Sequence, residues 1–432
     1  MKSRPTALLA ELDQVWRRSD RLFELVRPAL WTRRPLPLRH PPVFYLGHLP
    51  AFAWNQLGRE VLGLGHEDPS LDVLFERGID PLTPSASDDV AVSDWPGIEQ
   101  ILGYRDRVRS RIWTEGVSRV SVDLPDPRVL QVLNVIIEHE QMHHETLLYM
   151  LQVAPKTDLQ RPLGWPLLIR GGAAVEPDEV AIPGGTVTLG TPDGEGFAWC
   201  NERPAHSVEV QPFGLDRVPV DNGHFVTFVR AGGYESRDLW SDDAWDWLSG
   251  RTHPQNWRNA GQGFEVRSLL EWHPLPEVRG WPVQVSAVEA RAYSRWKAAR
   301  LPTEAELQWA AYGSEDPKMG LNTEGLNTNF ETGGPVPVGS MEGSVSPFGV
   351  HELLGNGWEW TQTPFAPFEG FQPTIASYPG YSADFFDGDH DVVFGASWAT
   401  ARRLVRPGFR NWYQRKYPYV FSSFRLAHDS RE

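Results

Sequence analysis

The apolar pattern of this chain changes once, and that change constrains the fold more than any other feature. From Ala7 to about Pro155, apolar residues recur every three or four positions, the spacing of helices that bury one face. From Ile182 onward, short alternating stretches are separated by glycine and proline instead. We therefore expect a two-domain α+β protein, with a four-helix bundle over residues 1–165 and an irregular α+β domain over residues 175–432.

The periodic stretches define the expected elements. In the first domain the predicted helices cover 8–16, 22–30, 43–62, a segment that opens near Pro96, and Leu130–Gln152, with a long connection over 67–95. In the second domain, residues 182–190 predict a strand after a Pro-Gly-Gly turn, and helices are expected over 220–231 and 286–299. The remainder, rich in glycine, proline and tryptophan, predicts loops with scattered strands.

Composition argues against several classes of function. A formal charge of −15 without a basic face argues against nucleic acid as a partner. The single cysteine, Cys200, rules out an intramolecular disulfide or a cysteine-based metal cluster, and we expect it to be structural. Because no stretch approaches the ~20 apolar residues of a membrane span, we expect a cytoplasmic protein without a membrane partner.

Residues 138–145 read EHEQMHHE, inside the last predicted helix of the first domain. His139 and His143 are four residues apart, so a helix places both imidazoles on one face, as two ligands of one metal require. The best candidate for a third ligand is His48, in the predicted helix 43–62. The alternative is that these are ordinary core or surface histidines on an acidic helix.

Six phrases in the second part resemble the formylglycine-generating-enzyme-like fold, which is also C-type-lectin-like. They are IPGG at 182–185, NERPAH at 201–206, RLPTEAE at 300–306, GNGWEW at 355–360, GASW at 395–398 and FRL at 424–426. The first part looks like a DinB-type helical bundle. The combination resembles the ergothioneine-pathway sulfoxide synthases, which are non-heme iron enzymes. The resemblance implies Fe(II) held by His48, His139 and His143, and an O₂-dependent reaction that joins a sulfur donor to the imidazole of hercynine.

The same resemblance implies roles for two pairs of residues in the second part. Tyr378 and Tyr381 match a catalytic Tyr-x-x-Tyr pair, with Tyr378 as the proton donor and Tyr381 as a water-holding partner. Asn411 and Trp412 match the Asn-Trp pair that binds hercynine, whose quaternary ammonium suits an aromatic face. The alternative for the two tyrosines is packing within a loop, and the alternative for Trp412 is core filling.

The chain departs from that pattern at three places. Tyr413 and Tyr417 stand where the γ-glutamylcysteine-dependent synthases carry an Asp and an Arg, and Met142 replaces a glutamine beside the last ligand histidine. We expect all three to line the donor site, and the two tyrosines favour a sugar-like donor over a zwitterion. The sequence thus looks most like the selenoneine synthase branch, which uses a selenosugar.

Three other hypotheses remain open. The first is hercynine sulfoxide synthesis with cysteine or γ-glutamylcysteine as the donor. The second is a zinc thiol transferase, as in other DinB-type proteins, and the third is a non-catalytic ligand-binding scaffold. The bound metal separates them, because iron supports a synthase, zinc supports a transferase and no metal supports a scaffold.

Overall fold

The protein is described here from a computed structural model, in which the chain forms two compact units. Unit 1 comprises Met1–Trp165 with Ala376–Tyr378, and unit 2 comprises Pro166–Ile375 with Pro379–Glu432. The structure describes residues 4–76, 95–116, 126–176, 178–313, 325–375, 378 and 380–429.

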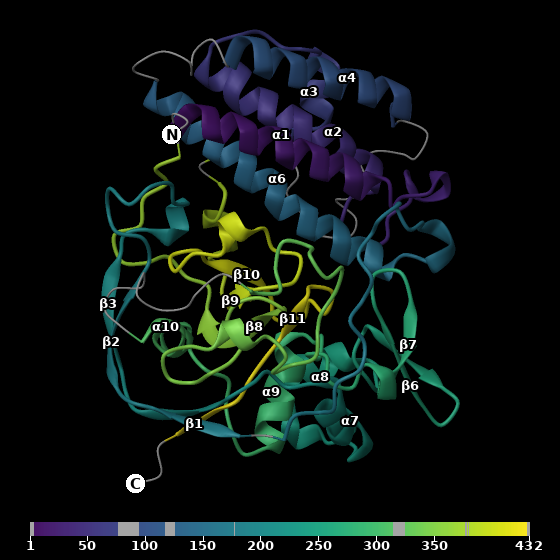
Figure 1. Ribbon diagram of the computed structural model, residues 1–432, viewed down its shortest axis with the longest axis vertical. Helices are drawn as coiled ribbons and strands as arrows, with labels where there is room; N and C mark the ends of the chain where they lie inside the picture. The colour runs from purple at the N-terminus through teal and green to yellow at the C-terminus, as the bar shows by residue number, and fades with distance from the viewer. Residues whose placement is uncertain are drawn as a thin grey trace. The chain divides into compact units, whose positions relative to one another are not determined.

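Unit 1 is a bundle of long helices that lie side by side (Figure 1). They are α1 (Arg4–Phe23), α2 (Pro42–Ala53), α4 (Ile98–Arg111) and α6 (Pro127–Val153), with a short helix α3 (Pro69–Leu74). Asp126 caps α6 by accepting a hydrogen bond from the backbone N–H of Arg128, and Pro127 at the first helical position has no N–H to satisfy. The helices predicted at 8–16, near Pro96 and at Leu130–Gln152 are confirmed.

Helix α2 is buried along its whole length, and a π-helical segment, Trp54–Val61, continues it. Together they confirm the helix predicted at 43–62. The helix predicted at 22–30 is wrong, because α1 ends at Phe23 and a 3₁₀ turn occupies Pro28–Leu30. Pro28 has no N–H for a helical ladder, and the N–H of Arg27 donates instead to the carbonyl of Asp158 at 3.0 Å. The connection predicted at 67–95 contains α3, and its residues 77–94 lie outside the described part of the chain.

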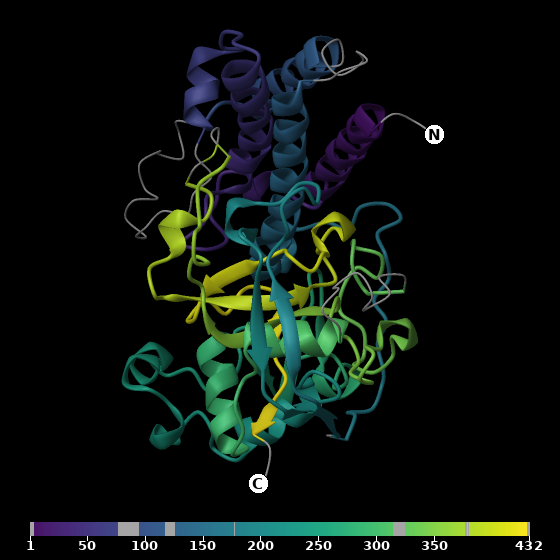
Figure 2. The same cartoon turned by 90° about the vertical axis from the view of Figure 1, so that its left-hand side faces the viewer.

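Unit 2 is built on small sheets rather than one large sheet (Figure 2). The four-stranded sheet has the order β10 (Asn411–Gln414), β9 (His390–Ala396), β8 (Gly357–Pro364), β11 (Ser422–Ser423), and only β11 runs parallel to its neighbour. A second sheet joins β1 (Glu179–Ile182), β4 (Phe213–Asp216) and β12 (Ala427–Asp429). The remaining sheets are β2 (Gly185–Leu189) with β3 (His206–Val210), and β5 (Trp257–Ala260), β6 (Gly263–Arg267) and β7 (Trp272–Pro274). Residues 182–190 thus contain the predicted turn and strand.

The helices of unit 2 are α7 (Asn222–Arg230), α8 (Asp242–Leu248), α9 (Ala287–Trp296) and α10 (Glu304–Tyr312). α7 and α9 confirm the helices predicted at 220–231 and 286–299, whereas α8 and α10 were not predicted. Both α9 and α10 begin with a capping box, in which Ser286 pairs with Glu289 and Thr303 with Glu306. The molecule is therefore a two-domain α+β protein, as the sequence predicts. Among the described helices, none combines the length and apolar character needed to cross a membrane.

Candidate metal centre

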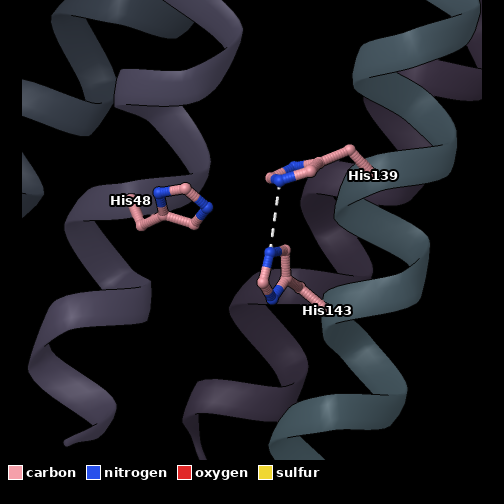
Figure 3. Close-up of side chains that lie close together, drawn as sticks. All are labelled: His48, His139 and His143. Atoms are coloured by element: carbon pink, nitrogen blue, oxygen red, sulfur yellow. Dashed lines mark hydrogen bonds between the residues drawn. The ribbon is translucent and has the colours of Figure 1, made fainter. Parts of the chain in front are cut away.

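Two helices of unit 1 bring three histidine rings to one point (Figure 3). His48 comes from α2, and His139 and His143 come from successive turns of α6, whose helical repeat places them on one face. One ring nitrogen from each residue lies within 4.8 Å of the others, and Nε2 of His139 is 3.2 Å from Nε2 of His143. The structure thus brings together the three residues that the sequence singles out.

A backbone carbonyl on the side away from the other two histidines fixes the orientation of the His48 ring. Its Nδ1 lies 2.8 Å from the carbonyl oxygen of Phe75, which only accepts, so Nδ1 carries the proton. Nε2 is then left with its lone pair, and this buried atom has no hydrogen-bond partner among the described residues. A histidine held through one nitrogen by a carbonyl, with the other nitrogen directed at a shared point, is the usual form of a metal ligand.

Burial keeps all three imidazoles neutral. It lowers the pKa of His48 to about 4, with the Phe75 carbonyl acting in the opposite direction. Burial also holds the pKa of His139 and of His143 well below the ordinary value, and the neighbouring histidines add to this effect. Neutral imidazoles are the form that binds a metal. Three converging nitrogen lone pairs therefore fit a divalent ion of the imidazole-preferring class.

Aromatic side chains enclose the three histidines. Phe52 stacks on His139 with ring centroids 3.5 Å apart and an angle of 9° between the planes. Phe44 stacks on His48 at 5.2 Å, and Tyr45 lies 5.5 Å from the ring of His143. These rings limit the rotation of the imidazoles and reduce contact with water. Phe44 and Phe52 stand four residues on either side of His48, a spacing that the sequence analysis did not use.

Tyr378 groups with unit 1 although it lies far along the chain. Its ring meets Phe52 edge-on at 5.2 Å and His139 edge-on at 6.2 Å. The side chain is half-buried. Tyr378 was predicted from the second part of the sequence, and the structure places its ring beside that of His139.

In unit 2, Tyr381 and Trp412 belong to one aromatic cluster. Tyr381 stacks on Trp199 at 3.9 Å and meets Trp412 edge-on at 5.4 Å. Trp412 also stacks on Phe365 at 4.2 Å with an angle of 6° between the planes. The side-chain oxygen of Asn411 accepts the backbone N–H of Trp412 at 2.9 Å. Trp199 and Phe365 were not predicted, because single tryptophans and phenylalanines carry no spacing signal.

The three positions that depart from the family pattern lie in different surroundings. Tyr413 and Tyr417 form a parallel pair with centroids 6.2 Å apart and an angle of 8° between the planes. Met142 is half-buried on α6, immediately before His143.

The single cysteine is part of the interior of unit 2. Cys200 is buried, and its sulfur accepts the backbone N–H of Ile375 at 3.4 Å, three residues before Tyr378.

A buried three-histidine site that could hold a metal ion, in a helical bundle joined to an irregular α+β domain, defines the class of two-domain protein to which this chain belongs. Comparison with known families agrees with this architecture. The DinB superfamily model matches residues 11–147, and the model of the sulfatase-modifying factor enzyme 1-like domain matches residues 171–430.

Comparison with individual proteins gives a more specific result. The hercynine oxygenase of Mycobacterium tuberculosis is 36% identical over 403 residues, which cover 85% of this chain and 90% of the relative. The hercynine oxygenase of Mycolicibacterium thermoresistibile is also 36% identical, covering 71% of this chain and 70% of the relative. Ergothioneine biosynthesis protein 1 of Neurospora crassa is 28% identical, covering 92% of this chain and 54% of that protein. The chain belongs to the hercynine oxygenase family and is an enzyme.

Proposed function

We propose that this enzyme uses iron(II) and O₂ to join a sulfur donor to the imidazole of hercynine, as a sulfoxide synthase of the ergothioneine pathway. The observation that carries the proposal is the convergence of His48, His139 and His143 on one point, with the Nε2 of His48 free of any described hydrogen-bond partner. The names of the relatives support hercynine as the substrate and sulfur as the chalcogen. They favour this reading over the selenosugar reaction that the sequence led us to prefer.

His48, His139 and His143 would hold the iron through neutral imidazole nitrogens. Three such ligands leave up to three positions open on a six-coordinate ion, so bound iron supplies O₂ activation and a place for a thiolate. The role of the chain is to fix the ligands and to exclude water. Phe44 and Phe52, stacked on His48 and His139, serve both purposes.

Tyr378 is proposed as the proton donor. Its edge-on contacts with Phe52 and His139 hold the phenol ring beside the histidine cluster. Reduction of O₂ consumes protons, and a phenol O–H at this position delivers one at its Oη atom. Tyr381, three residues on, is proposed to hold water as a partner of Tyr378.

Asn411 and Trp412 are proposed to bind hercynine. Its trimethylammonium group has no N–H to donate, so it is recognised by aromatic faces rather than by an ion pair. Trp412 is held rigidly between Phe365 and Tyr381, which reduces the entropy lost on binding. The amide of Asn411 is a neutral partner for the carboxylate end of the same molecule.

The parallel rings of Tyr413 and Tyr417 favour a second candidate function, selenoneine synthesis with a selenosugar donor. Two flat phenol rings suit the face of a sugar, whereas a zwitterionic amino-acid donor calls for charged partners. Met142, beside His143, would line the donor site in either case. This candidate shares the metal, O₂ and hercynine with the first and differs only in the donor.

One assay tests both candidates. The enzyme is loaded with Fe(II) and given hercynine, O₂ and a mixture of cysteine, γ-glutamylcysteine, a thiosugar and a selenosugar, and the products are identified by mass spectrometry. Sulfur addition from cysteine or γ-glutamylcysteine supports the first candidate, and selenium addition supports the second. Absence of any hercynine product, with O₂ and iron supplied, would overturn both.

A further inference from the structure

The short helix α3 takes no part in the chemistry proposed above, yet it ends beside a metal-ligand candidate. Phe75, the residue directly after α3, supplies the carbonyl that accepts the Nδ1–H of His48 at 2.8 Å. The N–H of Phe75 donates in turn to the carbonyl of Leu71 within α3, at 3.0 Å. The position of α3 therefore determines where the acceptor for His48 lies.

The ring of Phe75 is fitted to α2 as closely as its carbonyl. A Cβ atom added at Gly47 would lie 2.4 Å from the Phe75 ring, so only glycine allows this approach. Trp95 also stacks on the Phe75 ring, with centroids 6.2 Å apart. Phe75 thus has little freedom to move unless α3 moves with it.

Asp72 is the buried hub that holds α3 in place. Its side chain is fully buried, and Oδ1 accepts the hydroxyl of Tyr104 at 2.6 Å. Oδ2 accepts the backbone N–H of Glu67 at 3.0 Å and faces Nδ1 of His66 at 2.9 Å. The backbone carbonyl of Asp72 accepts the side-chain amide of Asn55 at 3.2 Å. Both carboxylate oxygens are therefore paired.

These contacts fasten α3 to two other elements. Tyr104 is on α4, and Asn55 is on the π-helical segment that continues α2 beyond His48. Glu67 adds ion pairs to Arg107 and Arg111 of α4, each at 2.8 Å. Those two arginines are partly exposed to solvent, so their pairs contribute less than the buried Asp72–Tyr104 hydrogen bond.

We propose that Asp72 and Tyr104 are positioning residues for the metal centre. By fixing α3, they hold the carbonyl of Phe75 where it orients the imidazole of His48 toward His139 and His143. This inference rests on the proposed function in one respect, namely that the three histidines bind a metal.

The test is metal affinity, measured without turnover. Tyr104→Phe removes one hydroxyl, and Asp72→Asn removes the charge while keeping the shape of the side chain. Both variants should raise the Kd for Fe(II) and for Co(II), by up to the roughly 10- to 100-fold that losing the outer partner of a ligand histidine itself costs. The absorption spectrum of bound Co(II) should change as well, because a misdirected His48 alters the ligand field.

Unit 2 offers a matched control. Tyr234 donates its buried hydroxyl to the buried carboxylate of Glu289 at 2.6 Å, the same kind of bond at the same length. Tyr234→Phe should lower the melting temperature about as much as Tyr104→Phe and leave the Kd for both metals unchanged. If Asp72→Asn does not fold, Tyr104→Phe still decides, because a phenyl ring fills the same space.

The outcomes are distinct. Tyr104→Phe with a wild-type Kd and a wild-type Co(II) spectrum would overturn the inference, even if the variant melted earlier. An equal rise in Kd for Tyr104→Phe and Tyr234→Phe would also overturn it, since the effect would then be general destabilisation. Failure of the wild-type enzyme to bind either metal would overturn the metal centre itself, and with it the proposed function.

Discussion

The two units fix the positions of their buried polar side chains by different physical means. In unit 1, α2 is buried along its full length and the repeat of α6 aligns His139 with His143, so regular backbone geometry does most of the positioning. In unit 2 the strands are short, and buried ion pairs join distant segments. Arg425, for example, binds the carboxylate of Glu359 through two nitrogens and also donates to three backbone carbonyls.

This difference has a consequence for mutation. A candidate ligand such as His139 can be removed while the helix stays in place, because its imidazole contacts the rings of Phe52 and His143 and balances no buried charge. A buried arginine in a loop-rich domain cannot lose its partner so easily, because an uncompensated charge is left in the core. Unit 1 should therefore separate function from stability, and unit 2 should couple them.

The largest expected effect is that of His139→Ala. Metal binding and turnover should both be abolished, because one of the three proposed ligands is gone. The far-ultraviolet circular dichroism and the helical packing of α6 should persist. Metal analysis by mass spectrometry checks the prediction, with His253→Ala in unit 2 as the control. Normal metal content in His139→Ala would contradict the assignment of His139 as a ligand, and a lost helical signal would contradict the separation of function from stability in unit 1.

Tyr378→Phe should have the next largest effect, a loss of reaction rate. Loss of a positioned proton donor typically costs about 10²- to 10⁴-fold in rate. Metal content and the Kd for hercynine should stay close to wild type, because the phenyl ring keeps its contacts with Phe52 and His139. Single-turnover product formation measures the loss. Full product yield from this variant would remove Tyr378 from the proposed mechanism.

In unit 2, Glu359→Ala should reduce the free energy of unfolding by about 3–5 kcal/mol, because it strands the buried guanidinium of Arg425. Calorimetric unfolding measures this change. Glu331→Ala is the matched control, since the Glu331–Arg402 pair is about half exposed and should change stability by less than ~1 kcal/mol. Similar losses in the two variants would show that buried ion pairs do not hold unit 2 together.

The pH dependence of the metal-free enzyme should reveal the buried histidines of unit 1. Burial lowers the pKa of His48 to about 4 and that of His144 to about 3, whereas an unfolded histidine titrates near ~6.5. As pH falls below about 6.5, the unfolded chain binds protons that the folded bundle does not, so stability falls. The loss should be about 2 kcal/mol per histidine at pH 5.

Melting temperatures between pH 7.5 and pH 5 measure this dependence, and His48→Gln should flatten it. His428 in unit 2 should contribute to the pH dependence of stability in the opposite direction. Its hydrogen bond to Asp216 raises the pKa, so its stabilising effect is present at low pH and is lost as pH rises through the folded value. A melting temperature that is independent of pH in the metal-free wild type would contradict the burial of neutral imidazoles.

The same contrast explains what the sequence could predict. Helical spacing located α2, α6 and the partnership of His139 with His143, because these depend on residues close in the chain. It did not locate the Phe75 carbonyl, since a backbone atom has no side-chain signature. The helix predicted at 22–30 is wrong because the apolar spacing continues through Pro28, although the helix does not. There the hydrogen bond from the N–H of Arg27 to the carbonyl of Asp158 replaces a helical one.

Unit 2 was less predictable for a physical reason. Helix α10 begins with a Thr303–Glu306 capping box that is visible in the sequence and could have been used. The contacts of Tyr381 and Trp412 could not be predicted from the sequence. The residues involved, Trp199, Phe365 and Tyr381, come from separate loops with no common spacing. Positions set by contacts between remote loops need coordinates, whereas positions set by a helical repeat need only spacing.

Substitutions of Cys200 should have the smallest effects, and they test the contrast between the two units most finely. The sulfur of Cys200 accepts the N–H of Ile375 at 3.4 Å, so it holds the backbone of unit 2 at that residue, three positions before Tyr378 in the sequence. Cys200→Ser keeps an acceptor and should lower stability by about 1 kcal/mol or less, with little change in rate. Cys200→Val leaves that buried N–H unpaired and should cost about 1–3 kcal/mol.

The rate separates a positioning role from a packing role for Cys200. If the anchor positions Tyr378, Cys200→Val should lower the single-turnover rate by several-fold more than Cys200→Ser does, while metal content stays normal in both variants. If the anchor only fills space, valine should perform as well as serine, since it replaces the sulfur with apolar volume. Equal rates would mean that the position of Tyr378 depends on its contacts with Phe52 and His139, and therefore on the regular helices of unit 1.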